Sequence, residues 1–247
     1  MTGFSAVSVS ASLLAHHHRE GRGPTLVFLP GYASDMGGTK ALALDAWAAA
    51  HGRPMLRFDY SGCGESPGEF EAQSLAQWLG DTLGMIDEVA QGPVVLIGSS
   101  MGGWLMLHAA LARPERVAGL IGIAAAPDFT GWGYSEEEKL TILSTGRLEQ
   151  PNPYGEAPTV TSRVFWESGE AMRLTHGPIA IDCPVRLLHG QQDPDVPWAW
   201  SLRLAELIRS PDVRVTLVKH GDHRLSRDAD IALLTATVAD LMEQLDP

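Results

Sequence analysis

The chain has 247 residues, of which 45% are hydrophobic and 19% charged, and its formal net charge is −12. This length and composition are those of a globular protein with a large core, and they exclude a disordered or fibrous chain. No cluster of lysine and arginine is available to neutralise phosphates, so nucleic acid is excluded as an expected partner.

The N-terminal residues 1–21 lack a basic segment followed by a long apolar run, and no stretch of the chain approaches the ~20 apolar residues that span a bilayer. We therefore expect no signal or transit segment, no membrane span and a cytoplasmic location. Three adjacent histidines, residues 16–18, cannot all face one metal ion and are read as the edge of a strand. Cys63 and Cys183 occur in unrelated contexts, which predicts two reduced thiols.

Apolar runs alternate with helical patterns along most of the chain. Strands are predicted at 25–31, 54–60, 94–100, 117–125, 185–190 and 213–219, and helices near 39–52, 74–90, 104–112, 199–210 and 229–245. Strands that are apolar throughout and separated by helices indicate a parallel sheet covered on both faces. Right-handed crossovers then give a doubly wound α/β fold, in which chemistry gathers at the carboxyl ends of the strands.

A connection of close to 60 residues separates the strand ending near Ala125 from the one starting at Val185. It holds a short acidic helical pattern at 135–143, a turn rich in proline and glycine, and several aromatic residues. Such a length is too great for a plain connection. We expect an inserted lid over residues 127–182, flanked by core segments 1–126 and 183–247.

The most informative motif is G-x-S-x-G at residues 98–102, between an apolar strand and a helical segment. By chance the pattern is expected about once in six such sequences, so its context carries the argument. Glycines allow the sharp turn that lifts Ser100 from the sheet and leaves the amide of Met101 free at a helix N-terminus. Ser100 is therefore the candidate nucleophile.

A serine nucleophile needs a base, and the base needs an acid that orients it. Asp193 leaves the strand at 185–190, whereas Asp195 is expected to cap the next helix, which Pro197 would begin. We favour Asp193 as the acid and retain Asp195 as the alternative.

Two histidines follow the strand at 213–219. His220 adjoins the strand, and His223 lies farther out on the loop, where it can swing over the edge of the sheet, so we favour His223 as the base. His108 and His189 fall inside a helix and a strand and are read as packed polar residues.

Acyl transfer also needs hydrogen-bond donors for the tetrahedral oxyanion. The backbone amide of Met101 is one candidate. The loop after the first apolar strand supplies the other, the amide of Tyr32, where Gly31 permits an unusual backbone. The glycine-rich segments at 58–68 and 31–40 match neither a dinucleotide fingerprint nor a phosphate loop, so no cofactor and no metal are expected.

The motifs at 98–103, 189–193 and 220–223, together with the segment at 57–66, resemble the α/β-hydrolase superfamily. Within it, blocks from about residue 24 to 245 resemble the α/β-hydrolase-domain ten family of acyl-glucuronide esterases and palmitoyl-protein thioesterases, and its bacterial relatives. The resemblance implies an α/β-hydrolase fold and a triad of Ser100, Asp193 and His223.

The expected activity is that of a serine hydrolase that cleaves carboxylic esters or thioesters of acyl substrates through an acyl-enzyme. One alternative is a small-molecule carboxylesterase with incidental thioesterase activity. Another is a ligand receptor with little turnover. The natural substrate and the oligomeric state stay open at this stage.

Overall fold

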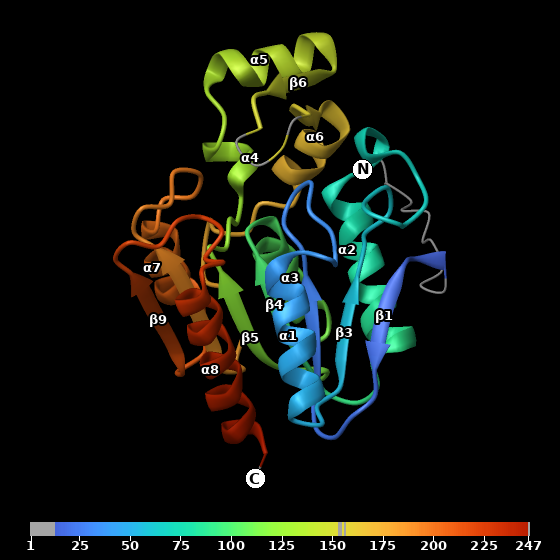
Figure 1. Cartoon of the computed structure of the whole chain (residues 1–247). Coiled ribbons are helices and arrows are strands. Elements are labelled where there is room, and N and C mark those ends of the chain that lie inside the picture. Colours follow the sequence, from blue (N-terminus) through green and yellow to red (C-terminus); the bar gives the residue numbers. More distant parts are fainter. Residues whose placement is uncertain (1–12, 153–154, 156, 247) are drawn as a thin grey trace.

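The computed structural model describes residues 13–152, 155 and 157–246, and a mostly parallel sheet stands at its centre. Strand order is β1-β3-β2-β4-β5-β8-β9, and only the edge strand β1 runs antiparallel to its neighbour. The strands are β1 (His16–Arg19), β2 (Thr25–Leu29), β3 (Met55–Phe58), β4 (Val94–Ser99), β5 (Val117–Ile123), β8 (Val185–Gly190) and β9 (Val213–Val218). The carboxyl ends of the parallel strands meet at the upper edge in Figure 1.

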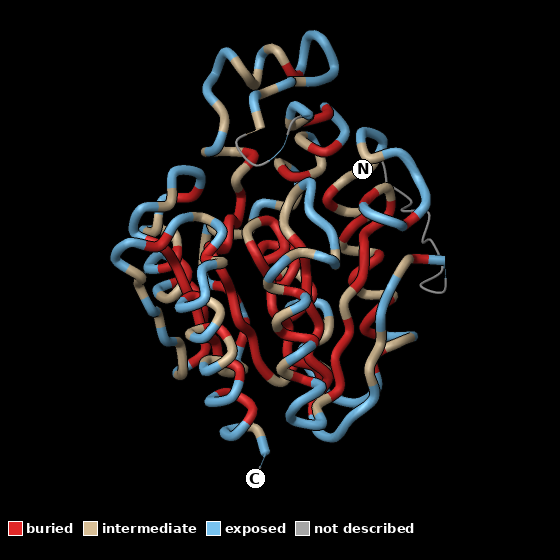
Figure 2. Tube along the Cα trace, viewed as in Figure 1, coloured by how far each residue is buried: buried red, intermediate tan, exposed pale blue. Residues whose placement is uncertain are grey.

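Helices cover both faces of this sheet, as the apolar strands predicted (Figure 1). The helices α1 (Thr39–Ala50) and α8 (Asp228–Leu245) pack on one face, and α2 (Leu75–Gly84), α3 (Met101–Ala112) and α7 (Ala199–Leu207) pack on the other. All six residues of β4 are buried, and alternate residues of the strand join the two hydrophobic clusters. Figure 2 shows this burial along the central strands. Burial on both faces explains why these strands are apolar throughout.

Two helix predictions were wrong in detail. The helix expected over 74–90 ends at Gly84, and a π-helical turn, η3 (Met85–Val89), follows and closes with a 2.9 Å hydrogen bond from the Ala90 amide to the Met85 carbonyl. The helix after β8 begins at Ala199, with Trp198 rather than Asp195 at its N-cap.

The connection between β5 and β8 folds over the carboxyl ends of the strands (Figure 1). Its elements are α4 (Phe129–Trp132), α5 (Glu136–Thr145), the antiparallel hairpin of β6 (Arg147–Gln150) and β7 (Thr159–Ser162), and α6 (Arg163–Ala171). The predicted acidic helix is confirmed as α5, which begins with a capping box between Ser135 and Glu138. The sequence did not predict the hairpin or α6.

One carboxylate ties the two ends of this insertion together. Asp128 is fully buried, and its oxygens accept hydrogen bonds of 2.9 Å from the backbone amides of Leu174 and Thr175. The insertion therefore leaves and rejoins the core at nearly one point. The division into core segments 1–126 and 183–247 and an inserted lid at 127–182 stays a prediction. Residues 1–12, 153–154, 156 and 247 lie outside the described residues.

Three smaller expectations can be compared with the described residues. His16–Arg19 form the edge strand β1, and Cys63 and Cys183 are free thiols, as predicted. In the part of the chain that the structure describes, no helix is both long enough and apolar enough to cross a membrane. The expected absence of a leader concerns residues 1–21, of which residues 1–12 lie outside the described residues.

Candidate active site

Ser100 occupies a strained turn between β4 and α3, with φ 54° and ψ −118°. A side chain rarely adopts this conformation unless the surrounding packing enforces it. That packing depends on glycine, because a Cβ at Gly98 would overlap the Gly102 carbonyl and a Cβ at Gly102 would overlap the Leu29 carbonyl. The motif glycines thus let the turn press against both its own helix and the end of β2.

The structure brings together the three side chains that the sequence singled out as a triad. His223 Nε2 lies 3.1 Å from Ser100 Oγ, and His223 Nδ1 lies 2.8 Å from Asp193 Oδ2. The residues come from the loops after β4, β9 and β8, at one edge of the sheet. Among the alternatives, His220 is instead near Gln192, with 3.4 Å between His220 Nδ1 and Gln192 Nε2.

The Asp193 carboxylate is fully buried and surrounded by donors. Its Oδ1 accepts 2.8 Å hydrogen bonds from the backbone amides of Asp195 and Val196. Burial alone would raise the pKa of this carboxyl, but hydrogen bonds from His189 and His223 outweigh burial and hold the pKa well below its ordinary value. Asp193 therefore stays ionised, as a group that orients an imidazole must.

His189 is a member of this cluster that sequence reasoning did not identify. It is fully buried, as expected for a packed histidine, but its Nε2 lies 3.2 Å from Asp193 Oδ2 and 3.0 Å from the Val196 carbonyl. Its Nδ1 lies 2.7 Å from Ser201 Oγ. With two oxygen acceptors facing Nε2, the ring donates from Nε2, and the Ser201 hydroxyl can donate to Nδ1. The spacing of four residues before the acid, at a strand end, is the signal that could have revealed it.

The two backbone amides expected to hold the oxyanion lie on segments that meet at the turn. A Cβ on Gly31 would be 3.4 Å from Ser100 Cβ, so the loop after β2 runs beside the serine. Met101 is the first residue of α3, where an amide has no partner within the helix. The segments that carry the Tyr32 and Met101 amides therefore flank Ser100.

The side chain of Tyr32 points away from the serine and into the insertion. Its hydroxyl donates a 2.7 Å hydrogen bond to the Val160 carbonyl on β7, and its ring lies 4.6 Å from the Phe165 ring. Further aromatic contacts reach Phe70, Trp78 and Phe129. One residue thus connects the loop beside Ser100 to the insertion above it.

A cavity of about 810 Å³ opens above Ser100 and His223. Phe129, Trp132 and Tyr134 of the insertion line it together with residues of the core, so the insertion helps to enclose the serine. This volume is in the range of cavities that bind small molecules. The cluster of Asp193, Asp195 and His223, whose donor atoms lie within 4.8 Å, could also suit a metal ion, but Asp193 and His223 already hydrogen-bond to each other.

Lys40 is a half-buried cation that lines this cavity, as does Arg224. Burial, followed by the nearby charge of Arg224, lowers the pKa of Lys40 to about 8. Its Nζ donates a 2.5 Å hydrogen bond to the Arg224 carbonyl. His108, which was read as a packed residue, is confirmed as one, because its Nε2 lies 2.9 Å from the Met172 carbonyl.

Comparison with known proteins identifies the family of this chain. A family model described as serine aminopeptidase, S33, matches residues 22–146. Palmitoyl-protein thioesterase ABHD10, mitochondrial, of Homo sapiens is 44% identical over 236 residues, which cover 94% of this chain and 77% of that protein. The chain belongs to the α/β-hydrolase family. The expected α/β-hydrolase fold and hydrolase class are therefore confirmed.

Two solved α/β-hydrolase structures resemble the whole fold. The α/β-hydrolase domain-containing protein 10 from mouse shares 44% identity, with a TM-score of 0.88, 94% of this chain covered and 95% of that one. A putative hydrolase from Agrobacterium vitis S4 shares 38% identity, also with a TM-score of 0.88 and 93% of each chain covered. The likeness thus extends through the insertion and both core segments.

The cytoplasmic location expected from the sequence is wrong on this comparison. Several relatives that are 43–45% identical to this α/β-hydrolase are named as mitochondrial proteins. The expectation rested on the absence of a recognisable leader, and such an absence does not determine where a protein resides.

Proposed function

We propose that this α/β-hydrolase cleaves carboxylic ester or thioester bonds of acyl substrates, with Ser100 as nucleophile, His223 as general base and Asp193 as the orienting acid. The observation that carries the proposal is the continuous hydrogen-bonded series from Ser100 Oγ through the His223 ring to Asp193 Oδ2. The relative named palmitoyl-protein thioesterase supports a thioester among its substrates.

In this mechanism His223 Nε2 takes the proton of Ser100 as its Oγ attacks the acyl carbonyl. Negative charge develops on the carbonyl oxygen, where the backbone amides of Tyr32 and Met101 stabilise it. His223 then gives the proton to the leaving thiol or alcohol. Water attacks the acyl-enzyme by the same route and releases the acid, with Ser100 restored.

We further propose that residues 127–182 act as a lid that selects the acyl substrate. Three aromatic side chains of this segment line the cavity above Ser100, and Trp132 stacks on Trp200 of α7 with ring centroids 5.2 Å apart. Apolar covering of this kind favours acyl chains over phosphorylated or polyanionic groups.

The test is hydrolysis of a short p-nitrophenyl ester together with labelling by a fluorophosphonate probe. Wild-type protein should turn over the ester and be labelled, and Ser100→Ala should lose both. Labelling of Ser100→Ala at the wild-type level would overturn the assignment of the nucleophile. Single-turnover acylation without steady-state hydrolysis would instead favour a low-turnover ligand receptor.

Matched thioesters and oxygen esters of equal chain length then separate a thioesterase from a carboxylesterase with incidental thioesterase activity. A higher kcat/KM for the thioesters across chain lengths supports the thioesterase. A uniform preference for small oxygen esters supports the carboxylesterase.

A further inference from the structure

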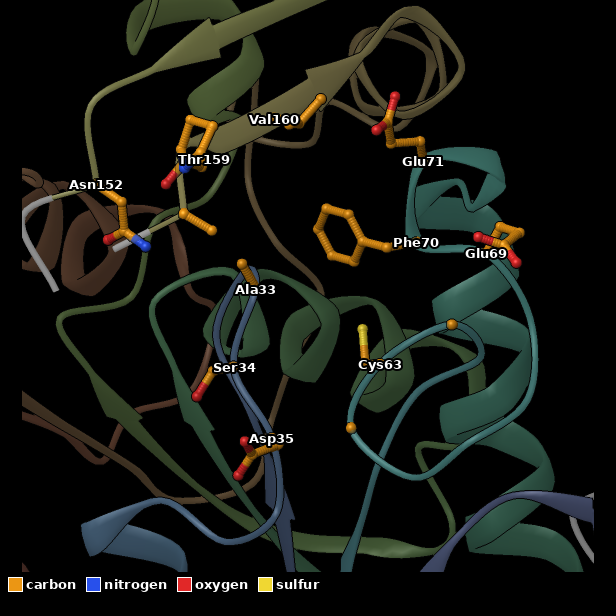
Figure 3. Close-up of a pocket in the computed structure, with 14 residues that line it drawn as sticks. Ala33, Ser34, Asp35, Cys63, Glu69, Phe70, Glu71, Asn152, Thr159 and Val160 are labelled. Carbon is orange, nitrogen blue, oxygen red and sulfur yellow. The ribbon is translucent and has the colours of Figure 1, made fainter. Parts of the chain in front are cut away.

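A second cavity, of about 500 Å³, adjoins the catalytic one and is shown in Figure 3. We propose that this side cavity binds the distal part of the acyl group, and that it accepts uncharged chains and rejects chains that end in an anion. This inference rests on the proposed function of Ser100, since it concerns the acyl part of the substrate at that site.

The two cavities are separated by a single loop. Ala33, Ser34 and Asp35, directly after Tyr32, line both of them, and Asn152 and Thr159 of the insertion also line both. In Figure 3 Ala33 lies at the crest of this loop, below Thr159. A ligand that extends from Ser100 past this loop therefore enters the side cavity without crossing the core.

The position of the side cavity relative to the strands indicates that it receives the acyl group and not the leaving group. Its walls come from the loop after β3, from the short 3₁₀ helix η2 (Phe70–Ala72) and from β7. Ser100 follows β4, and His223 follows β9 at the opposite end of the sheet. Because the leaving group must take a proton from His223 Nε2, it occupies the His223 side, and the acyl chain is directed toward β3.

Part of the side-cavity wall is apolar, formed by Ala33, Cys63, Phe70, Ala157, Pro158 and Val160. In Figure 3 the Cys63 Sγ points toward the Phe70 ring, and Val160 lies on the far side of that ring. Cys63 is 7% exposed, and burial, followed by the charge of Asp59, raises the pKa of its thiol to about 12. The thiol therefore stays neutral at physiological pH and serves as part of a surface for methylene groups.

Carboxylates stand at the edges of this apolar wall. Asp35, Glu69 and Glu71 line the cavity, and Arg147 forms a 3.2 Å ion pair with Glu71. Of the described residues that line the cavity, none is lysine, arginine or histidine. An acyl chain ending in a carboxylate would bring a like charge close to Asp35 and Glu69, and the described lining residues offer it no cationic side chain, which disfavours binding.

The experiment compares kcat/KM for acetyl and decanoyl p-nitrophenyl esters in the full-length wild type and in variants that narrow the side cavity. Val160→Trp and Cys63→Phe each fill part of it, so the decanoyl-to-acetyl ratio should fall at least about tenfold in both. The matched control is Val164→Trp, a second valine of the insertion, which is 51% exposed on α6. Its ratio should equal that of the wild type.

The decanoyl-to-acetyl ratio of kcat/KM separates loss of the side cavity from a general loss of activity, because a general loss lowers both rates equally. A decanoyl-to-acetyl ratio that is unchanged in both narrowed variants overturns the side-cavity assignment, as does an equal fall in Val164→Trp. Wild-type kcat/KM should also be at least about tenfold lower for the matched ester whose decanoyl chain ends in a carboxylate. Equal rates for the two chain ends would overturn the exclusion of anions. If the wild type hydrolyses none of the esters, the proposed function itself fails.

Discussion

His189 Nε2 lies 3.2 Å from Asp193 Oδ2, the same oxygen that accepts from His223 Nδ1 at 2.8 Å. One oxygen of the Asp193 carboxylate thus lies within hydrogen-bond distance of two imidazoles, and of these two His223 is the one that contacts Ser100. A donor that withdraws charge from Asp193 weakens its attraction for a protonated His223. In the proposed mechanism, His189 is therefore a positioning residue that acts on His223 through Asp193.

His189→Leu removes this donor and should move the acid-side midpoint of the kcat/KM profile to higher pH. The reason is that Asp193 then attracts a positive charge on the His223 ring more strongly. Stability should also fall by about 1–3 kcal/mol, because buried Ser201 loses its partner.

The control is His189→Gln, whose amide nitrogen can donate to Asp193 in place of the ring. We expect its acid-side midpoint to stay near that of the wild type. If His189→Leu lowers the temperature of unfolding without moving the pH profile, the role of His189 is structural only.

Asp193 and Asp195 can be separated by a matched pair of substitutions. Asp193→Asn should lower kcat by about 10⁴-fold, because the amide cannot hold the imidazole in the required tautomer. Asp195→Asn should change kcat less than about threefold, since the backbone amide of Asp195, which donates to Asp193, is kept in this variant. Steady-state kinetics on a short ester measures both. A larger loss in Asp195→Asn would contradict the assignment.

Gly102 and Gly80 offer a test of the close packing at the nucleophile turn. A Cβ at Gly102 would overlap the carbonyls of Leu29 and Pro30, whereas a Cβ at Gly80 would meet no described atom within 4 Å apart from its chain neighbours and the backbone of its own helix. Gly102→Ala should cost about 1–3 kcal/mol of unfolding free energy and lower kcat by about 10²-fold or more, as the loop that carries Tyr32 is displaced.

Gly80 lies inside α2, so Gly80→Ala should raise the unfolding free energy by about 0.5–1 kcal/mol and leave kcat unchanged. Chemical denaturation and ester kinetics on the two variants make the comparison. Equal stability of the two alanine variants would show that the contact at Gly102 can relax.

Lys40 predicts a dependence of stability on pH. Its pKa is about 8 in the folded protein, below the ordinary lysine value of 10.5, so between these values the unfolded chain binds a proton that the folded chain has lost. The contribution of Lys40 to the free energy of unfolding therefore rises as the pH increases from 8 toward 10. Asp222 and Asp230 face the ammonium and oppose the shift, while burial and Arg224 cause it.

Denaturation of wild type and Lys40→Met at pH 7.5 and 9.5 measures this effect. The wild type should gain stability relative to Lys40→Met at the higher pH. Lys219→Met, at an exposed lysine, is the control and should show no such difference. A relative loss of wild-type stability at pH 9.5 would contradict the sign.

The sheet and its helices could be predicted because their signals are local. The run at residues 94–97 is apolar at every position, and this pattern is typical of a strand whose two faces are both covered. The hairpin of β6 and β7 lacks that signal. Its strands Arg147–Gln150 and Thr159–Ser162 are polar, and they pair with each other rather than against a core.

The candidate site also contains residues that could be predicted from local sequence and contacts that could not. Ser100, Asp193 and His223 could be chosen because each follows a strand, and parallel strands bring their carboxyl ends together. The contact of His189 with Asp193 depends on how the loop at 190–196 turns back on its own strand. The tie between Tyr32 and Val160 spans 128 residues of sequence, and no local pattern reports such a contact.

The hydrogen bonds from the amides of Leu174 and Thr175 to Asp128 join the two ends of the insertion, so the insertion is a segment that can be exchanged as one unit. Its two ends meet at one buried carboxylate beyond the last residue of β5, so exchange of the segment between them leaves every strand of the sheet uncut. Chimeras that keep these hydrogen bonds and replace the intervening residues can therefore vary the side chains above Ser100, while the core segments that carry Ser100, Asp193 and His223 stay unchanged. Substrate range and catalytic chemistry can in this way diverge separately within one chain.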